Sequence, residues 1–330
     1  MNKPRKANDD IYLHTHHVFR SHEPLLGDAS RNRAFYRALK EHITPDSTVL
    51  DIGTGTGIWA VVAARLGARR VVAVEKDEML IPIIRSLTRE NGVEGKVEVV
   101  NGDSRHLKLG GRFSVVISET VGNQAFEEDI VPIMVDARNR FLKPGGVLIP
   151  SSVRLMAAAA RVKRAYKKMP AGVRLKAAYF ETLNLNIPIV LLNKARLKML
   201  SKPKVLIEAD LTTIKSPPDM SNLVARWKMS DLLQVNCFAV WAELTLTNNA
   251  KLSTADTSNW SPVLYPFKPF GEGRGEVEFT LNLSAKNHHW RAALSRKGNK
   301  EVRAYSPVFA YTALMTHIEM AEMAEALRKT

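Results

Sequence analysis

Two glutamates, Glu119 and Glu128, have the clearest chemical potential in the sequence. Glu119 follows the apolar run 113–118, and Glu128 comes nine residues later, after a loop of small and polar residues. Two ionised carboxylates repel each other when they lie close together, unless a cation sits between them. A guanidinium suits that place because its planar fork of N–H donors binds both acids at once. The pair therefore predicts a site that grips a guanidino group.

A second motif predicts a ligand site built from backbone. The apolar strand that begins at Val49 runs into three alternating glycines, Gly53, Gly55 and Gly57. Glycine allows a tight turn and removes the Cβ atoms that would keep a ligand away from the chain. The helix that follows offers the amides of its first turn. The motif indicates a nucleoside-bearing cofactor.

The spacing around these glycines indicates which cofactor. A dinucleotide fingerprint that starts at Gly53 needs a glycine where Ile58 stands. The chain instead has an acid, Asp51, before the three glycines, and a second acid, Glu75, closes the next apolar strand. This pattern is typical of S-adenosylmethionine sites in class I methyltransferases, with Asp51, Glu75 and the glycines as the cofactor-binding residues.

Further acids follow the predicted strands. Glu75 falls where a carboxylate accepts both ribose hydroxyls, and Asp103 with Ser104 falls where a side-chain acceptor and a backbone amide meet the amino edge of adenine. A metal site built from the acids around Glu119 is a competing interpretation, but no histidine lies near them in sequence. We therefore expect no metal.

These motifs need a framework that brings them together. Apolar runs typical of buried strands alternate with helical periodicity up to residue 150. The expected helices are 31–39, 58–66, 78–91 and 130–141, and the expected strands are 48–51, 70–75, 97–101, 113–118 and 147–149. This alternation predicts an α/β fold, a Rossmann-like doubly wound parallel sheet covered on both faces. The ligand then lies over the carboxyl ends of the strands, where the acids fall.

Beyond Pro150 the pattern changes to short alternating strands separated by Asn, Gly, Ser and Pro clusters, as in residues 240–246 and 276–283. Such strands predict a second, antiparallel β domain over residues 151–330. Residues 177–200 interrupt the β pattern, which predicts an inserted helical arm. A chain of 330 residues is long enough for two well-packed domains.

Charge is placed unevenly along the chain. Residues 151–330 carry 27 Lys and Arg against 14 Asp and Glu, whereas residues 1–150 are nearly balanced. The basic run over residues 154–204 makes nucleic acid a candidate partner. The chain has one cysteine, no apolar run of membrane-spanning length and no charged-then-apolar start, so we expect a cytoplasmic protein that does not enter a membrane.

Over roughly residues 11–285 the chain resembles the protein arginine N-methyltransferase family. The stretch Tyr12–Tyr36 is similar to the family's cover over the cofactor, which implies that Arg31 clamps the methionine carboxylate of S-adenosylmethionine. The loop Ser118–Glu128 is similar to the family's double-glutamate loop, and the resemblance makes its two end glutamates catalytic. It also implies three parts: a cover segment over 1–30, the S-adenosylmethionine-binding domain over 31–150, and a β-barrel substrate domain over 151–330.

A fourth segment, ending in Ser258-Asn259-Trp260, resembles the family's Thr-His-Trp loop, which makes Asn259 and Trp260 substrate-binding residues. Asn259 stands where the family usually has a histidine, whose aspartate partner corresponds to Asp28. An amide cannot relay a proton, so this departure bears on the acceptor and the product pattern more than on methyl transfer. By the same analogy, the helical arm at about 177–200 docks on a second copy and makes a homodimer.

We therefore expect an S-adenosylmethionine-dependent N-methyltransferase that acts on a guanidino nitrogen of arginine in a protein or peptide, or of an arginine-like small molecule. Two alternatives stay open. The basic run 154–204 suggests a methyltransferase whose acceptor is RNA or another small molecule. Asn259 suggests a non-catalytic binding protein with a methyltransferase fold.

Overall fold

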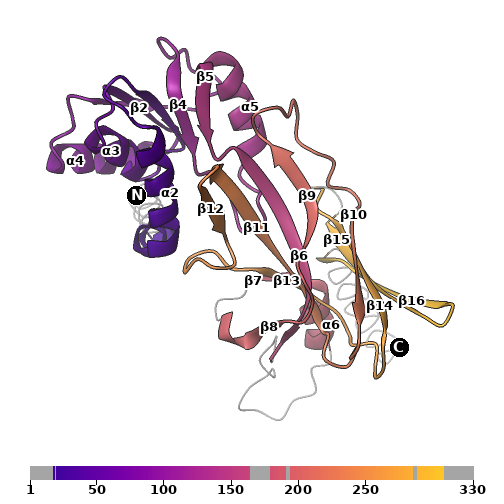
Figure 1. The fold of residues 1–330 in the computed structure, drawn as a ribbon. Coiled ribbons are helices and arrows are strands. Elements are labelled where there is room, and N and C mark those ends of the chain that lie inside the picture. The colour runs from indigo at the N-terminus through magenta and orange to yellow at the C-terminus, as the bar shows by residue number, and fades with distance from the viewer. Residues whose placement is uncertain (1–17, 19, 164–178, 191–193, 285–287, 308–330) are drawn as a thin grey trace, which may run out of the picture. The chain divides into compact units, whose positions relative to one another are not determined.

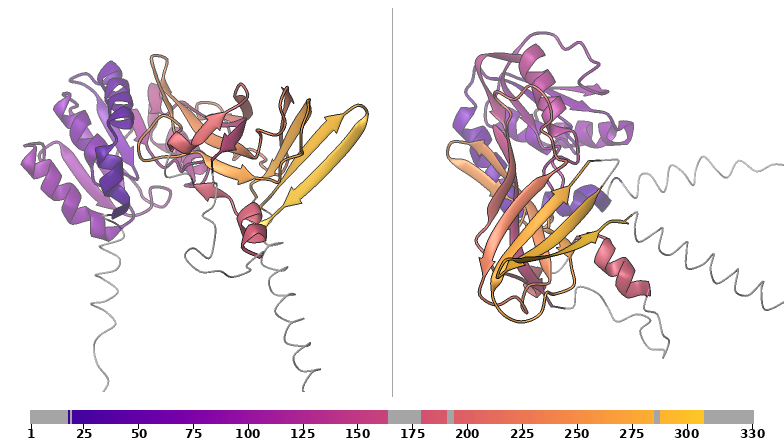
Figure 2. Two further views of the ribbon diagram at one scale, coloured as in Figure 1. Left: turned by 90° about the horizontal axis from the view of Figure 1, so that it is seen from below. Right: turned by 90° about the vertical axis from the view of Figure 1, so that its right-hand side faces the viewer.

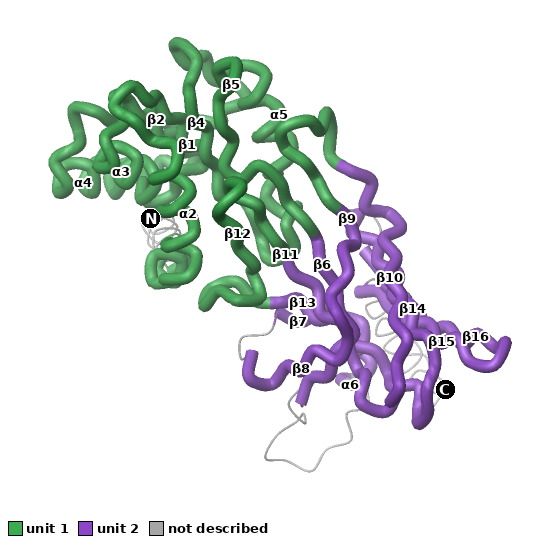
Figure 3. The backbone as a smooth tube through the Cα atoms, viewed as in Figure 1, with its two compact units in different colours: residues 1–154, 208–217, 242–261 green, residues 155–207, 218–241, 262–330 purple. Residues whose placement is uncertain are grey.

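The computed structural model describes residues 18, 20–163, 179–190, 194–284 and 288–307 (Figure 1). The chain forms two compact units, and each unit is built from three separate segments of the sequence (Figure 3). Unit 1 contains residues 1–154, 208–217 and 242–261, and unit 2 contains residues 155–207, 218–241 and 262–330. Residues 151–154, 208–217 and 242–261 of the predicted second domain therefore belong to the same unit as the glycine loop.

A five-stranded parallel sheet forms the centre of unit 1. Its order is β3-β2-β1-β4-β5, so the strand order reverses between β1 and β4. Strands β1 and β2 are almost entirely buried, because their continuous apolar runs are covered on both faces. The strands are β1 Thr48–Ile52, β2 Arg70–Glu75, β3 Val97–Asn101, β4 Phe113–Ser118 and β5 Leu142–Ile149.

The strand register brings the carboxyl ends of the strands together. Ile52 pairs with Ser118 across β1 and β4, and Glu75 pairs with Asn101 across β2 and β3. Residues that directly follow these four strands therefore meet at one edge of the sheet. In doubly wound folds, a reversal of strand order opens a crevice at this edge, which is where ligands bind.

Helices α3, α4 and α5 contact strands of the sheet, and α2 contacts α3. Figure 1 shows α2, α3 and α4 side by side, and α5 contacts β4 and β5. Helix α2 begins where the Asp28 carboxylate accepts the N–H of Arg31, and α3 begins after Gly57, whose φ is 88°. The helices are α2 Ala29–His42, α3 Ile58–Arg65, α4 Ile81–Glu90 and α5 Ile130–Arg140, and a 3-10 turn covers Glu78–Leu80.

Unit 2 is antiparallel β structure. One sheet has the order β10-β14-β15-β16, and its long β15–β16 hairpin is drawn in yellow in Figure 2. A second sheet has the order β7-β13-β11-β6-β8. The antiparallel strands are β6 Ser152–Val162, β7 Ile189–Val190, β8 Leu197–Met199, β9 Lys204–Asp210, β10 Leu223–Met229, β11 Cys237–Thr247, β13 Val263–Pro266, β14 Gly275–Asn282, β15 His289–Arg296 and β16 Asn299–Tyr305. One end each of β6, β9 and β11 belongs to unit 1.

Stacked aromatic side chains fill the core of unit 2. The ring of Phe238 lies 4.4 Å from that of Phe279 and 4.8 Å from that of Phe267, and Trp290 is fully buried. Large aromatic rings supply most of the apolar area that stabilises a core of short strands. The last part of β11 instead pairs with β12 Ala250–Ser253 inside unit 1, through Glu243 and Ser253.

The segment 177–200, for which the sequence predicts a helical arm, is described in part. Within its described residues only α6 Tyr179–Asn186 is an α-helix. Pro188 lacks the N–H that a longer helix would need, and the chain then forms the short strand β7. A 3-10 turn follows at Lys194–Arg196, and β8 pairs with β6. The described residues of this segment therefore change from helix to strand.

A parallel Rossmann-like sheet followed by antiparallel β structure confirms the expected fold class. Within the described ranges, no helix combines the length and the apolar character that crossing a bilayer requires.

Candidate functional site

A cavity of about 770 Å³ opens in unit 1 at the carboxyl edge of the parallel sheet. Its walls come from the segments that follow β1, β2, β3 and β4, from residues near the start of α2, and from the loop 259–260. Every residue predicted for the site lines this cavity except Asp51 and Gly57. The lining set is Arg31, Gly53, Gly55, Glu75, Asp103, Ser104, Glu119, Glu128, Asn259 and Trp260.

Glu75 and the glycine loop form one wall. The Glu75 carboxylate accepts the backbone N–H of Gly55 at 2.8 Å and that of Asp77 at 3.0 Å, which holds the loop against the end of β2. Gly53 has a φ of 65°, and a Cβ there would lie 2.7 Å from the Thr120 methyl carbon. Only glycine fits such a position without displacing its neighbours. The loop therefore presents bare backbone to the cavity.

Asp51 and Gly57 support the glycine loop and are not among the residues that line the cavity. The fully buried Asp51 carboxylate accepts the Thr54 hydroxyl at 2.5 Å. Burial raises the pKa of Asp51 to about 7 because the charged form loses its hydration. A Cβ at Gly57 would lie 2.9 Å from the Ile84 side chain, so Gly57 lets α3 and α4 approach. The structure thus gives both residues a supporting position, where the sequence predicts direct cofactor ligands.

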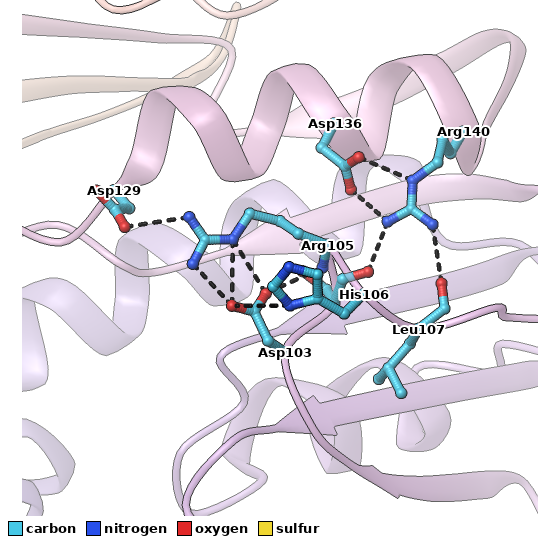
Figure 4. Close-up of polar contacts among 8 residues, drawn as sticks. Asp103, Arg105, His106, Leu107, Asp129, Asp136 and Arg140 are labelled. Atoms are coloured by element: carbon cyan, nitrogen blue, oxygen red, sulfur yellow. Dashed lines mark hydrogen bonds and ion pairs between the residues drawn. The ribbon is translucent and has the colours of Figure 1, made fainter.

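Asp103 lines the cavity, but its carboxylate is held by Arg105 (Figure 4). Arg105 donates from Nη2 to Asp103 Oδ2 at 2.7 Å, and its backbone N–H also donates to Asp103. These bonds lower the pKa of Asp103 to about 2. The carboxylate is therefore a permanently charged acceptor, and any ligand contact uses the lone pairs that Arg105 leaves.

A second arginine fixes the same loop from α5. Arg140 donates to the carbonyl oxygens of Ser104 at 2.6 Å and Leu107 at 2.8 Å, and Asp136 on α5 orients its guanidinium (Figure 4). Asp136 and Arg140 are four residues apart and so lie on the same face of the helix. Sequence reasoning missed Arg140, because its partners are carbonyl groups 33 and 36 residues away along the chain.

Glu119 and Glu128 are the two glutamates predicted to bind a guanidino group, which we call the clamp glutamates. In the structure, Glu119 forms an ion pair with Arg31. Both side chains are more than nine-tenths buried. Arg31 also donates from Nη1 to the Leu25 carbonyl at 3.1 Å and to Asn32 Oδ1 at 2.8 Å. Burial lowers the pKa of Arg31 to about 10, which still leaves it charged at neutral pH. Glu119 thus faces a guanidinium from its own chain.

Glu128, the second clamp glutamate, has no hydrogen bond or ion pair with any described residue. Its acidic neighbours are already engaged: Glu127 accepts the backbone and side-chain N–H groups of Gln124 at 2.9 and 3.0 Å, and Asp129 accepts from Arg105 at 3.2 Å. Surrounding protein and the charge of Glu127 raise the pKa of Glu128. Glu128 is therefore the available acid of the loop.

The loop that ends at Trp260 is held by Asp28. One Asp28 oxygen accepts the Arg31 N–H at 3.1 Å, and the other accepts the N–H groups of Ser258 at 2.9 Å and Asn259 at 3.0 Å. Asp28 is fully buried. Both of its oxygens bind backbone, so Asp28 positions the loop, while the Asn259 side chain has no hydrogen-bond partner within the described part of the chain.

His22 is a lining residue that the sequence did not reveal. Its Nδ1 lies 2.7 Å from the Val18 carbonyl oxygen, and its Nε2 faces Gly55, where a Cβ would lie 3.1 Å away. No periodic pattern points to this contact, because it joins the helical residues 20–27 to the glycine loop, which lies elsewhere in the sequence. Among the described residues, no group of three or more His, Cys, Asp or Glu is arranged to hold a metal ion.

The cavity meets two requirements of S-adenosylmethionine. A bare glycine backbone lies beside the buried Glu75 carboxylate, which suits an adenosyl group, and two buried N–H groups on its lining residues, Arg31 Nε and Trp59 Nε1, have no acceptor among the described residues. Residues 34–175 match the family model described as ribosomal protein L11 methyltransferase (PrmA).

Known proteins of similar sequence include arginine methyltransferases. The chain is 30% identical over 289 residues to an arginine N(omega)-methyltransferase of Streptomyces achromogenes subsp. streptozoticus, covering 81% of this chain and 79% of that protein. It is 28% identical over 276 residues to the probable protein arginine N-methyltransferase 6.1 of Oryza sativa subsp. indica, covering 79% and 71%.

A solved structure agrees with the fold. Protein arginine methyltransferase 10 of Arabidopsis thaliana superposes with a TM-score of 0.72 at 23% identity, over 86% of this chain and 96% of that one. The sequence relationship to the Streptomyces enzyme accounts for the glycine loop, for Glu75 at the end of β2 and for the loop that carries Glu119 and Glu128. The chain belongs to the protein arginine N-methyltransferase family of class I S-adenosylmethionine-dependent methyltransferases.

Proposed function

We propose that Glu119 and Glu128 together bind the guanidinium of the acceptor while S-adenosylmethionine occupies the glycine-loop side of the same cavity. One observation carries this proposal: of the acids at the clamp loop, Glu128 is the one without a partner among the described residues, and it lines the cavity with Glu119. A guanidinium bound at both residues would satisfy the free carboxylate of Glu128.

Glu119 already accepts a guanidinium N–H, that of Arg31. The guanidinium carbon of Arg31 lies 5.8 Å from the Trp260 ring centroid and 5.3 Å from that of Trp59, so aromatic faces surround the ion pair. Planar cations pack well against such faces. This wall of the cavity therefore has the chemistry that a second guanidinium needs.

S-adenosylmethionine supplies a methyl group bonded to a positively charged sulfur. The two glutamates draw the positive charge of the acceptor toward themselves and fix the orientation of its reacting nitrogen, so alignment supplies much of the rate. A proton must then leave the methylated nitrogen. The raised pKa of Glu128 suits it to accept that proton, since a carboxylate of higher pKa is a stronger base.

We infer further that the acceptor is a small arginine-like molecule with a carboxylate of its own. Lys76 lines the cavity close enough to Glu128 for its charge to lower that acid's pKa, and no ion pair among the described residues neutralises it. A free amino acid could place its guanidinium on the glutamates and its carboxylate near Lys76. The formal net charge of +15 also disfavours cationic protein substrates.

The test measures S-adenosylhomocysteine formation with arginine, with agmatine, which lacks the carboxylate, and with an arginine-rich peptide. We expect turnover of arginine, and a loss of about a hundredfold or more in kcat for Glu119→Gln and Glu128→Gln. Glu94→Gln, a surface acid outside the cavity, is the control and keeps full activity. Normal turnover by either clamp variant would refute the clamp, and preference for the peptide would refute the small-molecule acceptor.

A further inference from the structure

Two buried N–H groups beside the cavity have no acceptor in the described part of the chain. They are Arg31 Nε and Trp59 Nε1, and neither has a hydrogen-bond partner among the described residues. Both residues line the cavity, and each is only 3% exposed. A buried donor without a partner destabilises a protein by roughly 1–3 kcal/mol. A ligand that accepts from both donors would remove this cost.

The two donors come from side chains that are already packed together. The guanidinium carbon of Arg31 lies 5.3 Å from the Trp59 ring centroid. The Trp59 ring stacks on Phe35, with centroids 5.0 Å apart and planes inclined by 25°. Phe35 itself is fully buried, so the indole has little freedom to turn. The position of Trp59 Nε1 is therefore set by packing before any ligand binds.

The rest of the Arg31 guanidinium is engaged. Nη1 donates to Leu25 and Asn32, and Nη2 pairs with Glu119. Nε is the nitrogen left over, and the guanidinium that carries it lies 5.3 Å from the centroid of the indole ring. A pair of neighbouring N–H donors, one of them charged, matches the two oxygens of a carboxylate.

We propose that Trp59 is a cofactor-binding residue: its indole N–H and the Nε–H of Arg31 together bind the carboxylate at the methionine end of S-adenosylmethionine. The proposal rests on the proposed placement of the cofactor in this cavity and adds a ligand that the glycine motif does not contain. Trp59 is the second residue of α3, directly after the loop, so its ring enters the site from the helix that the loop begins.

This assignment explains why a large aromatic residue occupies the first turn of α3. A smaller apolar side chain could fill the core there, but it would offer no donor. Because the carboxylate contact is local, its loss should weaken only ligands that carry the carboxylate. The nucleoside contacts of Glu75 and of the loop after β3 should not change.

The experiment compares two ligands and two proteins by calorimetry, without any acceptor present. S-adenosylhomocysteine carries the amino-acid end, whereas methylthioadenosine has the same thioether nucleoside without it. The variant is Trp59→Phe, which retains an aromatic ring to stack on Phe35 and removes the N–H. We expect the dissociation constant for S-adenosylhomocysteine to rise about tenfold, in line with the loss of one charge-assisted hydrogen bond, and that for methylthioadenosine to change less than twofold.

Equal weakening of both ligands would overturn the proposal, because it would mean that the indole only packs. No weakening of either ligand would also overturn it, because the N–H would then have another acceptor. If the unmodified protein binds neither ligand, the cofactor site itself is wrong, and this outcome is distinct from the first two. Trp227→Phe, in the core of unit 2, is the matched control for loss of an indole and should leave both dissociation constants unchanged.

Discussion

Arg105 Nη1 donates to Asp129 Oδ2 at 3.2 Å, and this bond joins the loop after β3 to the residue that directly follows Glu128. The same guanidinium holds Asp103 on its other side (Figure 4). Asp129 has a φ of 61°, a conformation that aspartate tolerates better than most side chains. Arg105 thus links the loop predicted to bind adenine to the loop that carries Glu128.

Removing the bond between Arg105 and Asp129 should lower kcat/KM for the acceptor more than it lowers the stability of the protein. Asp129→Asn keeps the size and the backbone tolerance of the residue but removes its charge. Since Asp129 is largely exposed, the ion pair is worth at most about 1 kcal/mol, so we expect kcat/KM for the acceptor to fall by up to about fivefold. Steady-state kinetics check this at low and high salt, and the deficit should vanish at high salt.

Glu98→Gln is the control for the Asp129 experiment. It breaks another exposed pair of unit 1, in which Arg70 lies 2.6 Å from Glu98, away from the cavity-lining residues. Its kinetics should match those of the unmodified protein. An equal fall in both variants would show that the effect is a general one of surface charge.

Asp51 predicts a pH dependence of stability. Burial raises its pKa to about 7 from the ordinary 3.8, so the folded protein retains a proton that the unfolded chain has lost. The free energy of unfolding that Asp51 contributes therefore falls as the pH rises from about 4 to about 7, and it stays low above that range. An asparagine side chain cannot lose a proton, so the free energy of unfolding of Asp51→Asn should not fall in this way. Relative to the unmodified protein it should rise between these pH values, by roughly 4 kcal/mol at most.

Urea unfolding of both proteins between these pH values measures that gain. The comparison between proteins cancels the titration of the groups that they share. A stability difference that does not change with pH would contradict the assignment of the raised pKa to Asp51.

The hydrogen bonds of Asp28 predict the result of restoring the family histidine. Both Asp28 oxygens already accept backbone N–H groups, including that of Asn259. A new imidazole at position 259 would compete for an acceptor that the loop needs. We therefore expect Asn259→His to leave kcat within about threefold of the unmodified protein. Asp28→Asn should cost far more, roughly tenfold or more in kcat/KM, because it loses the charged acceptor of the loop.

Initial rates with the preferred acceptor decide this prediction. A large gain from Asn259→His alone would show that Asp28 is free to pair with a side chain. Melting temperatures of both variants separate loss of the loop position from loss of the fold.

The parts of the site that follow strands directly could be predicted from the sequence. The glycine loop and Glu75 are local features, and the parallel register alone brings them to one edge. The supporting contacts could not be predicted in this way. Arg105 reaches Asp129 across 24 residues and Asp28 reaches Asn259 across 231, and no periodicity encodes such pairs.

The division of residues 151–330 between the two units could not be predicted from the sequence either, because it too depends on contacts that are distant along the chain. Strand β12 pairs back on the end of β11, which puts residues 242–261 in unit 1, although their composition matches the rest of the β-rich half. The cover over residues 1–30 and the basic run 154–204 lie partly outside the described residues. The homodimer, its arm at about 177–200, nucleic-acid binding and the location in the cytoplasm therefore stay predictions.

The place of Trp260 in the cavity wall has a consequence for how the enzyme is made. A chain cut after residue 150 would keep the parallel sheet, all three glycines and both clamp glutamates, yet it would lack the indole that covers Arg31. During synthesis, this wall of the cavity is completed only after Trp260 has left the ribosome, later than the strands of the parallel sheet, which end at residue 149.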